Sequence, residues 1–327
     1  MKIPPSYNIT PEMIEIIAKI ESYRINFTSL NISTHLKEKI QRTSLLKSSL
    51  FSARIEGNPL QLSEVSFEKT KEIDKIEIFN IIEASNFIEK RVKKGSITKE
   101  MLLELHERVL KNINPDAGHI RHEPSAIFNQ AGVAVYIPPS PFDIPKLLDK
   151  LIVYVNNDSE KFPLIKALIV HLVFEKIHPF LDGNGRVGRL LISSILKAKG
   201  WNFSFTIPFE EYLDQNKSDY YYYLDIGLSD TSGYLIFMLN AYLSEIEKIK
   251  AQIEEESGKK GQLFLPPRQE EIFNIIKDHQ AISFDMIRRR FLKVPERTLR
   301  YDLKKLADKG IIEKTGETKG RFYRIKA

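Results

Sequence analysis

One short segment, HPFLDGNGRVGR at residues 178–189, gathers several groups that could act on a phosphate ester. His178 titrates near neutral pH, so it could accept a proton from an attacking hydroxyl. Asp182 supplies a hard oxygen ligand of the kind that holds Mg²⁺ together with the phosphates of a substrate. Gly183 and Gly185 permit a turn whose backbone N–H groups face inward, and the positive end of the following helix would complete an anion cradle.

Two arginines extend this pattern. Arg186 and Arg189 stand three residues apart, so we expect both guanidinium groups to project toward the same side of a helix, where two adjacent phosphates would suit them. A histidine before proline is commonly structural, and Asp-Gly-Asn-Gly alone would be a turn. Because base, metal ligand, cradle and cations fall within twelve residues, the segment predicts a site of phosphate chemistry.

The same segment also matches the dinucleotide fingerprint G-x-G-x-x-G at residues 183–188, and Glu210 lies where a ribose-binding acid could follow. Three observations disfavour this alternative. The preceding residues have a helical pattern, arginines occupy the turn, and no alternation of strands and helices indicates a parallel sheet. The sequence also lacks a phosphate loop of the pattern G-x-x-x-x-G-K-[ST].

Helices must position these groups. Residues 162–176 are nearly all apolar, which predicts a helix buried on most sides directly before the segment, and a second helix is predicted over residues 187–199. In the first predicted helix of the chain, Ile14, Ile17 and Ile20 form one stripe. The other expected elements are helices over residues 11–26, 34–56, 98–111 and from 144 onward, and a short strand over residues 133–137.

The composition indicates more than one domain and no membrane segment. The 327 residues suffice for two or three domains, and the chain has no cysteine. No stretch approaches the roughly 18 consecutive apolar residues of a membrane helix. We therefore expect a soluble, cytoplasmic protein without membrane contact. Residues 266–327 carry 16 Lys and Arg against 9 Asp and Glu, so this tail, behind a polar linker at residues 254–261, accounts for the net charge of +6.

The segment HPFLDGNGRVGR resembles the signature of the Fic family, HxFx(D/E)GN(G/K)RxxR, at every defined position. The resemblance extends over roughly residues 1–245 and includes the stretches AGHIR at 117–121, VYIPP at 135–139 and FEKIH at 174–178. It implies a mainly α fold in which a Fic-type helical core carries a small β-hairpin flap.

The resemblance implies a protein adenylyltransferase, which moves AMP from ATP to a Ser, Thr or Tyr hydroxyl of a target protein. The target is unknown, and whether the protein also modifies itself is left open. His178 would be the general base, and Asp182 would bind the cofactor Mg²⁺. Glycine at position 185, where a subgroup of the family has lysine, favours AMP transfer. The nucleotide-binding residues that it implies are Gly183, Asn184 and Gly185 for the α-phosphate, Arg186 and Arg189 for the outer phosphates, and Tyr220 and Tyr221 for adenine.

A second family feature is the sequence SARIEG at residues 52–57, which fits the inhibitory pattern (S/T)xxxE(G/N). Glu56 lies in the last turn of a predicted helix ended by Gly57, where its carboxylate faces the negative end of the helix dipole and needs a compensating cation. In autoinhibited members of the family, the matching glutamate pairs with the second arginine of the motif, here Arg189. We expect Glu56 to keep the enzyme mostly inactive. Related glutamates also support removal of AMP, so this reverse reaction stays open.

The stretch at residues 133–139 would form the flap, to which a segment of the target could add as an extra strand. Ile127 and Phe128 could clamp the entering residue. Of the tyrosines at 220–223, at least two are expected only to pack. No role is assigned to the histidines His35, His106, His119, His122 and His171.

The C-terminal tail is predicted to form three helices and a hairpin, over residues 268–278, 283–291, 295–309 and 311–326. This order resembles a winged helix-turn-helix. In its third helix the leucines 299, 303 and 306 share one face, and Arg297, Tyr301 and Lys304 lie opposite. A basic face with an aromatic residue suits a helix in a DNA groove, although winged helices on enzymes also serve dimerisation or protein contacts.

The expected domains are an N-terminal helical region with the inhibitory motif (1–95), a Fic catalytic core (96–250) and a winged-helix domain (266–327). The first hypothesis is an autoinhibited adenylyltransferase. Whether it forms a homodimer is left open. The alternative is a DNA-binding transcription regulator that senses nucleotide through a Fic-like domain. The intact His178 and Arg189 favour the enzyme, because a sensor could keep the cradle and lose the base.

Overall fold

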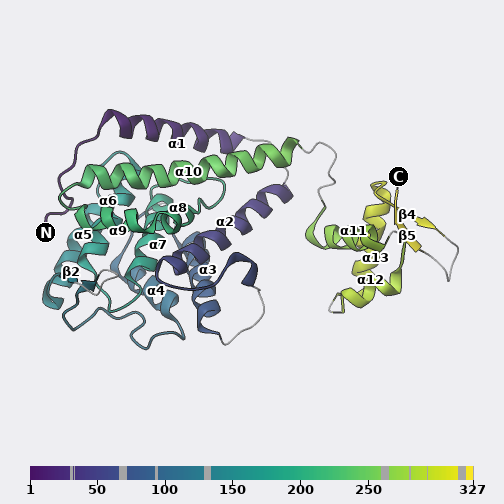
Figure 1. Ribbon diagram of the computed structural model, residues 1–327, viewed down its shortest axis with the longest axis horizontal. Helices are drawn as coiled ribbons and strands as arrows, with labels where there is room; N and C mark the ends of the chain where they lie inside the picture. The colour runs from purple at the N-terminus through teal and green to yellow at the C-terminus, as the bar shows by residue number, and fades with distance from the viewer. Residues whose placement is uncertain are drawn as a thin grey trace. The chain divides into compact units, whose positions relative to one another are not determined.

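The computed structural model describes residues 1–29, 32, 34–65, 72–92, 95–128, 134–258, 265–279, 281–292, 294–315 and 322–326 (Figure 1). The chain divides into two compact units. The first consists of Met1–Asn31 and Ile40–Ile253, and the second consists of Ile32–Lys39 and Glu254–Ala327. The HPFLDGNGRVGR segment lies wholly in the first unit.

Two buried helices, α6 and α7, form the centre of the first unit. α6 spans Pro163–Ile177 and buries nearly all of its residues, as its apolar run predicted. A proline fits its first position because first-turn N–H groups have no partner within the helix. α7 spans Asn184–Ala198 and packs along α6. It begins at Asn184, before the predicted start at Val187, so the asparagine of the motif already lies in its first turn.

Further helices surround this pair. α3 and α4 pack against α7, α5 packs against α6, and α1 runs beside α10 (Figure 1). The bounds are Pro11–Ser29 for α1, Thr34–Ile55 for α2, Ile73–Arg91 for α3, Lys99–Leu110 for α4, Ile144–Asn156 for α5, Phe209–Gln215 for α8, Lys217–Ile226 for α9 and Thr231–Gly258 for α10, with short 3₁₀ turns at Leu62–Glu64 and Pro141–Asp143.

The buried stripe of α1 differs from the predicted one. Ile17 and Ile20 are buried as expected, but Ile14 is 53% exposed, and Met13 and Ile16 are buried in its place. A spacing of three residues drifts by about 60° at each step of an α-helix, so Ile14 rotates out of the stripe that contains Ile20.

The dinucleotide alternative is contradicted by the element before the glycines. The residues that precede Gly183 form helix α6 and a short turn, whereas the fingerprint requires a strand there. Across the described ranges the strands form only a two-stranded and a three-stranded sheet, and neither contains a parallel pair.

A small antiparallel pair forms the described part of the expected flap. β1 spans Ile127–Phe128 and β2 spans Ala134–Tyr136, with Ile127 opposite Tyr136. Residues 129–133, including the start of the predicted strand at Val133, lie outside the described residues. The predicted strand is therefore confirmed over residues 134–136, and Ile137 lies just past its end.

The second unit has its own apolar core. Its elements agree with the predicted three helices and hairpin, with an added strand β3 that pairs with β5 and gives the sheet order β3-β5-β4. The predicted stripe of leucines 299, 303 and 306 is fully buried. The bounds are Pro267–His279 for α11, Ile282–Ser283 for β3, Phe284–Arg290 for α12, Glu296–Asp308 for α13, Ile312–Thr315 for β4 and Phe322–Ile325 for β5. Linker residues 259–261 and the hairpin glycines at 316 and 320 lie outside the described residues.

Within the described ranges, no helix combines the length and the apolar character that a membrane span requires.

Candidate active site

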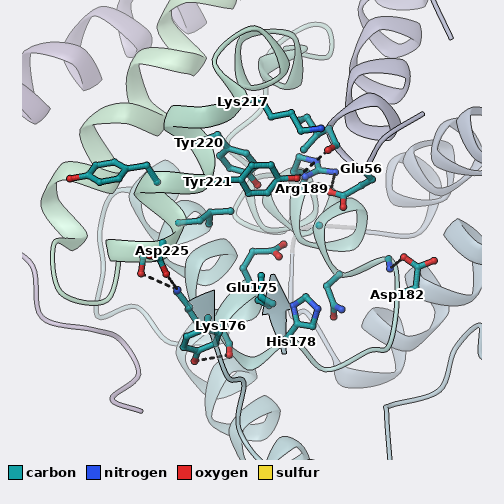
Figure 2. Close-up of a pocket in the computed structure, with 18 of the residues that line it drawn as sticks. Glu56, Glu175, Lys176, His178, Asp182, Arg189, Lys217, Tyr220, Tyr221 and Asp225 are labelled. Carbon is teal, nitrogen blue, oxygen red and sulfur yellow. Dashed lines mark hydrogen bonds and ion pairs between the residues drawn. The ribbon is translucent and has the colours of Figure 1, made fainter. Parts of the chain in front are cut away.

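A pocket of about 850 Å³ lies at the first turn of α7 (Figure 2). Its wall combines the end of α2, the last turn of α6, the loop before α7, and α9, with Ile127 and Tyr136 from the small sheet. The predicted site residues that line it are Glu56, His178, Asp182, Gly183, Asn184, Gly185, Arg189, Tyr220 and Tyr221. The fold thus brings residues more than 160 positions apart in the chain to one cavity.

His178 ends α6 in an unusual backbone conformation. It takes φ 49° and ψ 61°, in the left-handed region that non-glycine residues rarely adopt. Arg121 holds it there, because its Nε donates to the His178 carbonyl oxygen at 2.8 Å and its backbone N–H donates to the Pro179 carbonyl oxygen at 3.0 Å. The guanidinium of Arg121 also donates to the carbonyl oxygens of Glu123 and Pro139. Arg121 therefore fixes where the chain leaves α6.

The imidazole of His178 is neutral near pH 7. Burial lowers its pKa to about 4, while the backbone carbonyl of Glu175 acts in the opposite direction. Nδ1 is enclosed and has no hydrogen-bond partner among the described residues, which leaves Nε2 as the nitrogen open to the pocket. A neutral imidazole with an open nitrogen can accept a proton.

The loop before α7 is braced from within. The side chain of Asn184 accepts a hydrogen bond from the Phe180 backbone N–H at 3.0 Å and donates to the Phe180 carbonyl oxygen at 2.8 Å. Gly183 takes φ 78°, and a Cβ there would lie 3.3 Å from the Leu110 side chain. The amide of Asn184 therefore shapes the loop, and the glycine lets the chain turn into the first helical turn, whose N–H groups face an anion.

Arg186 and Arg189 do not act as a pair toward one side. Arg186 contacts Glu77 of α3 and donates to Asp182 Oδ1 at 2.6 Å, and it does not line the pocket. Arg189 lines the pocket and points to α2 instead. The expectation of two guanidinium groups side by side is therefore wrong, because one carboxylate on α3 and another directly after α2 hold them apart.

Glu56 and Arg189 form the ion pair that the sequence predicted. Arg189 Nη2 lies 2.8 Å from Glu56 Oε1 and also donates to the Ser52 carbonyl oxygen, while Nε donates to Ser52 Oγ at 3.0 Å. Arg189 is 1% exposed. Gly185 makes room for this pair, since a Cβ at that position would lie 2.2 Å from Glu56 Oε1. The end of α2 thus occupies the cavity wall beside the anion cradle.

Asp182 has the chemistry of a single magnesium ligand. Its Oδ1 accepts hydrogen bonds from the Gly183 backbone and from Arg186, and its Oδ2 has no partner among the described residues. The side chain is 48% exposed and lines the pocket. Among the described residues no group of three or more metal-ligating side chains occurs. One carboxylate that relies on substrate phosphates and water for the remaining positions is the usual Mg²⁺ arrangement, so the residues fit this ion.

The two predicted adenine contacts differ from each other. Tyr220 is 1% exposed and its hydroxyl contacts His171 Nε2 at 3.2 Å, so it mainly packs beneath the pocket. Tyr221 is 43% exposed, lines the pocket, and donates its hydroxyl proton to the Ile55 carbonyl oxygen at 3.1 Å. Of the two, Tyr221 has the open aromatic surface.

His106, to which the sequence assigned no role, supports the motif loop. Its Nδ1 accepts from the Gly118 backbone N–H at 2.8 Å, so Nε2 carries the proton and donates to the Asp182 carbonyl oxygen at 3.0 Å. Its ring stacks on Phe180 with centroids 3.6 Å apart. No sequence spacing relates α4 to the loop, so only the fold reveals this contact.

Comparison with known proteins agrees with this arrangement. Residues 96–196 match the family model of the Fic/DOC family. The chain contains a Fic domain. The matched range includes His178, Asp182 and Arg189, begins after Glu56, and contains no residue of the second unit.

Curated relatives of the Fic domain are proteins named protein adenylyltransferase Fic. The one from Drosophila willistoni is 29% identical over 223 residues, which cover 64% of this chain and 42% of the relative. The one from Drosophila melanogaster is 27% identical over 296 residues, which cover 83% of this chain and 58% of the relative. The chain therefore spans about half the length of the curated relatives it matches.

Solved structures share the fold. A Fic family protein from Desulfovibrio desulfuricans G20 superposes with a TM-score of 0.70 at 23% identity and covers 98% of both chains. Fic-1 from C. elegans gives a TM-score of 0.62 at 23% identity and covers 74% of this chain and 73% of that one. These likenesses confirm the predicted Fic-type helical fold.

Proposed function

We propose that the protein transfers AMP from ATP to a Ser, Thr or Tyr hydroxyl of a target protein. The observation that carries this proposal is the meeting of a neutral His178, the α7 anion cradle and Asp182 in one pocket of a Fic domain. The relatives' name, protein adenylyltransferase, supports the same chemistry.

In the proposed reaction the target hydroxyl oxygen bonds to the α-phosphorus, and the bond from that phosphorus to the oxygen bridging to the β-phosphate breaks. His178 Nε2 takes the hydroxyl proton, and pyrophosphate leaves with the bond electrons. The first-turn N–H groups of α7 and the helix dipole stabilise the charge that develops on the α-phosphate. Asp182 would hold Mg²⁺, which neutralises charge on the phosphates.

The ion pair between Glu56 and Arg189 supports an inactive resting state. Nε and Nη2 of the enclosed Arg189 donate to Ser52 and Glu56, which supports the proposal that Arg189 does not bind the outer phosphates of ATP while Glu56 is in place. A buried Arg–carboxylate pair is costly to break by removing the cation, whereas removal of Glu56 would free Arg189 for phosphate. The same carboxylate at the pocket wall could orient water for the removal of AMP.

Transfer of radioactivity from α-labelled ATP and Mg²⁺ tests this proposal. Wild type, Glu56→Gly and the double variant Glu56→Gly/His178→Ala are incubated alone and with a cell extract, so that label on the protein itself also counts. We expect strong labelling only with Glu56→Gly, because wild type is inhibited by Glu56 and the double variant lacks the His178 imidazole that accepts the hydroxyl proton. Equal labelling by the first two proteins would refute autoinhibition, and undiminished labelling by the double variant would refute the role of His178.

The second unit supports a second candidate function, contact with DNA. Arg297, Tyr301 and Lys304 are all exposed on one face of α13, opposite the buried leucines. Basic residues along one helix face lower the cost of approaching phosphates. Electrophoretic mobility of random duplex DNA with wild type and the triple alanine variant at these positions tests this function, and an identical shift with both proteins would contradict it.

A further inference from the structure

Glu175 has a carboxyl group in the pocket wall that the proposed chemistry does not use. It lies in the last turn of α6, three residues before His178, and points from that helix into the pocket (Figure 2). Its side chain is only 12% exposed. Oε1 is enclosed and has no hydrogen-bond partner among the described residues. A buried polar group without a partner is costly, so this arrangement needs a reason.

Helix α7 makes room for this carboxyl group and gives it no partner. A Cβ on Gly188 would lie 2.2 Å from Glu175 Oε1 and 3.2 Å from the ring of Phe174. The carboxyl group therefore lies against the bare α-carbon of a glycine, which offers no hydrogen bond. Any larger residue at position 188 would displace Glu175.

His171 lies close to Glu175, with 3.8 Å between Nε2 and Oε1, but its hydrogen bonds are committed elsewhere. The hydroxyl of Tyr234 donates its proton to the Leu168 carbonyl oxygen at 3.1 Å. The contact of 2.8 Å between this hydroxyl and His171 Nδ1 must then use a proton on Nδ1.

The other nitrogen of His171 consequently has no proton to give. Burial lowers the pKa of His171 to about 3, so the ring is neutral and Nε2 accepts from the Tyr220 hydroxyl at 3.2 Å. Glu175 therefore receives nothing from His171. Among the described residues, the hydrogen-bonding capacity of the carboxyl group is left for a molecule in the pocket.

We propose that Glu175 is a nucleoside-binding residue whose carboxyl group hydrogen bonds to a ribose hydroxyl of ATP. This inference rests on the proposed adenylyl transfer. The α-phosphate belongs at the first turn of α7, and the open aromatic surface of Tyr221 on α9 suits the base. Glu175 lines the same pocket and lies between Tyr221 and His178 in the view of Figure 2, where the sugar that joins base and phosphate belongs. A hydroxyl both donates and accepts, so it matches the carboxyl group in either protonation state.

Nucleotide affinity, measured by titration calorimetry with the whole chain of 327 residues, tests this proposal. The reference protein is Glu56→Gly/His178→Ala, in which Arg189 is released and turnover is blocked. We expect 2′-deoxy-ATP or 3′-deoxy-ATP to bind about 5-fold to 10-fold more weakly than ATP, the usual effect of one buried hydrogen bond. Adding Glu175→Ala should weaken the binding of ATP by the same factor and leave the affinity for that deoxy analogue unchanged. Glu175→Gln, which keeps an acceptor, should retain most of the discrimination.

Glu210→Gln is the matched control, because Glu210 also has a buried carboxyl group but lies outside the pocket lining. Glu210→Gln should leave the ratio of the affinities for ATP and the deoxy analogue as it is in the reference protein. The proposal is overturned if Glu175→Ala keeps the ratio of the affinities for ATP and the deoxy analogue. It is also overturned if Glu175→Ala abolishes only the discrimination between ATP and purine riboside triphosphate, which lacks the 6-amino group, because Glu175 would then contact the base. If Glu56→Gly still transfers AMP while the ratio stays constant, this inference fails and the proposed function stands. Should Glu175→Ala not fold, the reference protein alone keeps the test decisive, because equal affinity for ATP, 2′-deoxy-ATP and 3′-deoxy-ATP would overturn the proposal.

Discussion

The Nε atom of Arg121 donates a hydrogen bond to the backbone carbonyl oxygen of His178 at 2.8 Å. Arg121 is 2% exposed, and its other nitrogens donate to the carbonyl oxygens of Glu123 and Pro139. One buried side chain thus ties the end of α6 to the segments that lead into and out of the small sheet. A left-handed backbone at a non-glycine residue costs about 1–3 kcal/mol, and these bonds offset that cost at His178.

Arg121→Ala in the Glu56→Gly background should therefore lower kcat for AMP transfer by at least about 10-fold, because the base loses its fixed position. Affinity for ATP should change much less, since Arg121 does not line the pocket. Steady-state kinetics together with ATP titration separate the two effects. A loss confined to ATP affinity would contradict the positioning role.

Gly185→Ala should disturb the ion pair between Glu56 and Arg189. The added Cβ would lie 2.2 Å from Glu56 Oε1 and 3.0 Å from Arg189 Nη1, so the flexible end of Glu56 must move away. We expect Gly185→Ala to bind ATP at least about 3-fold more tightly than wild type does, because Arg189 is partly released. In the Glu56→Gly background the same substitution should give no such gain. A gain of equal size in both backgrounds would exclude displacement of Glu56 as its cause.

The pH dependence of kcat/KM should reflect the buried His178. Burial lowers its pKa to about 4, and only the neutral imidazole accepts a proton, so activity should be lost only as the pH falls toward that value. The charge of Glu56 raises this pKa, so Glu56→Gly moves it lower still. For Glu56→Gly we expect a flat profile between about pH 5.5 and pH 8 once ATP affinity is measured at each pH. An inflection near pH 6.5, the ordinary histidine value, would contradict this.

Glu210 should make stability depend on pH. Burial raises its pKa to about 8, above the value in the unfolded chain, so between about pH 5 and pH 8 the folded state binds more protons. The stability that this group contributes is present at low pH and is lost as the pH rises through about 8. Relative to wild type, Glu210→Gln should gain up to roughly 1.4 kcal/mol in free energy of unfolding per pH unit in this window. Urea unfolding at about pH 5, 6.5 and 8 measures it, and a constant difference would refute the shift.

Local sequence patterns sufficed for the elements around the site. The apolar run before His178 predicted α6, and the glutamate at the end of α2 pointed to the cation that Arg189 provides. The prediction of α6 follows from the burial of apolar residues, and the need for a cation follows from the carboxylate at a helix end. That Arg189 is this cation came from the resemblance to the Fic family, since no short-range rule identifies it.

The contacts that support the site were not predictable in this way. His106, Arg121 and Glu175 act through partners on other elements, and no spacing in the sequence relates them to those partners. Arg186 shows the same limit. Helical spacing placed it beside Arg189, but Glu77 of α3 holds it outside the pocket lining. Tertiary ion pairs override the direction that a helix alone would give a long side chain.

The position of the label in ATP tests the central claim most directly. Glu56→Gly is incubated in two parallel reactions, one with α-labelled ATP and one with γ-labelled ATP. Each reaction contains a cell extract in which labelling has been found, or the protein alone if it modifies itself. Transfer of AMP breaks the bond between the α- and β-phosphates, so protein should carry label from the α position only, and the γ label should appear in pyrophosphate. Protein labelled from the γ position, with none from the α position, would contradict adenylyl transfer and indicate a phosphoryl transfer in its place.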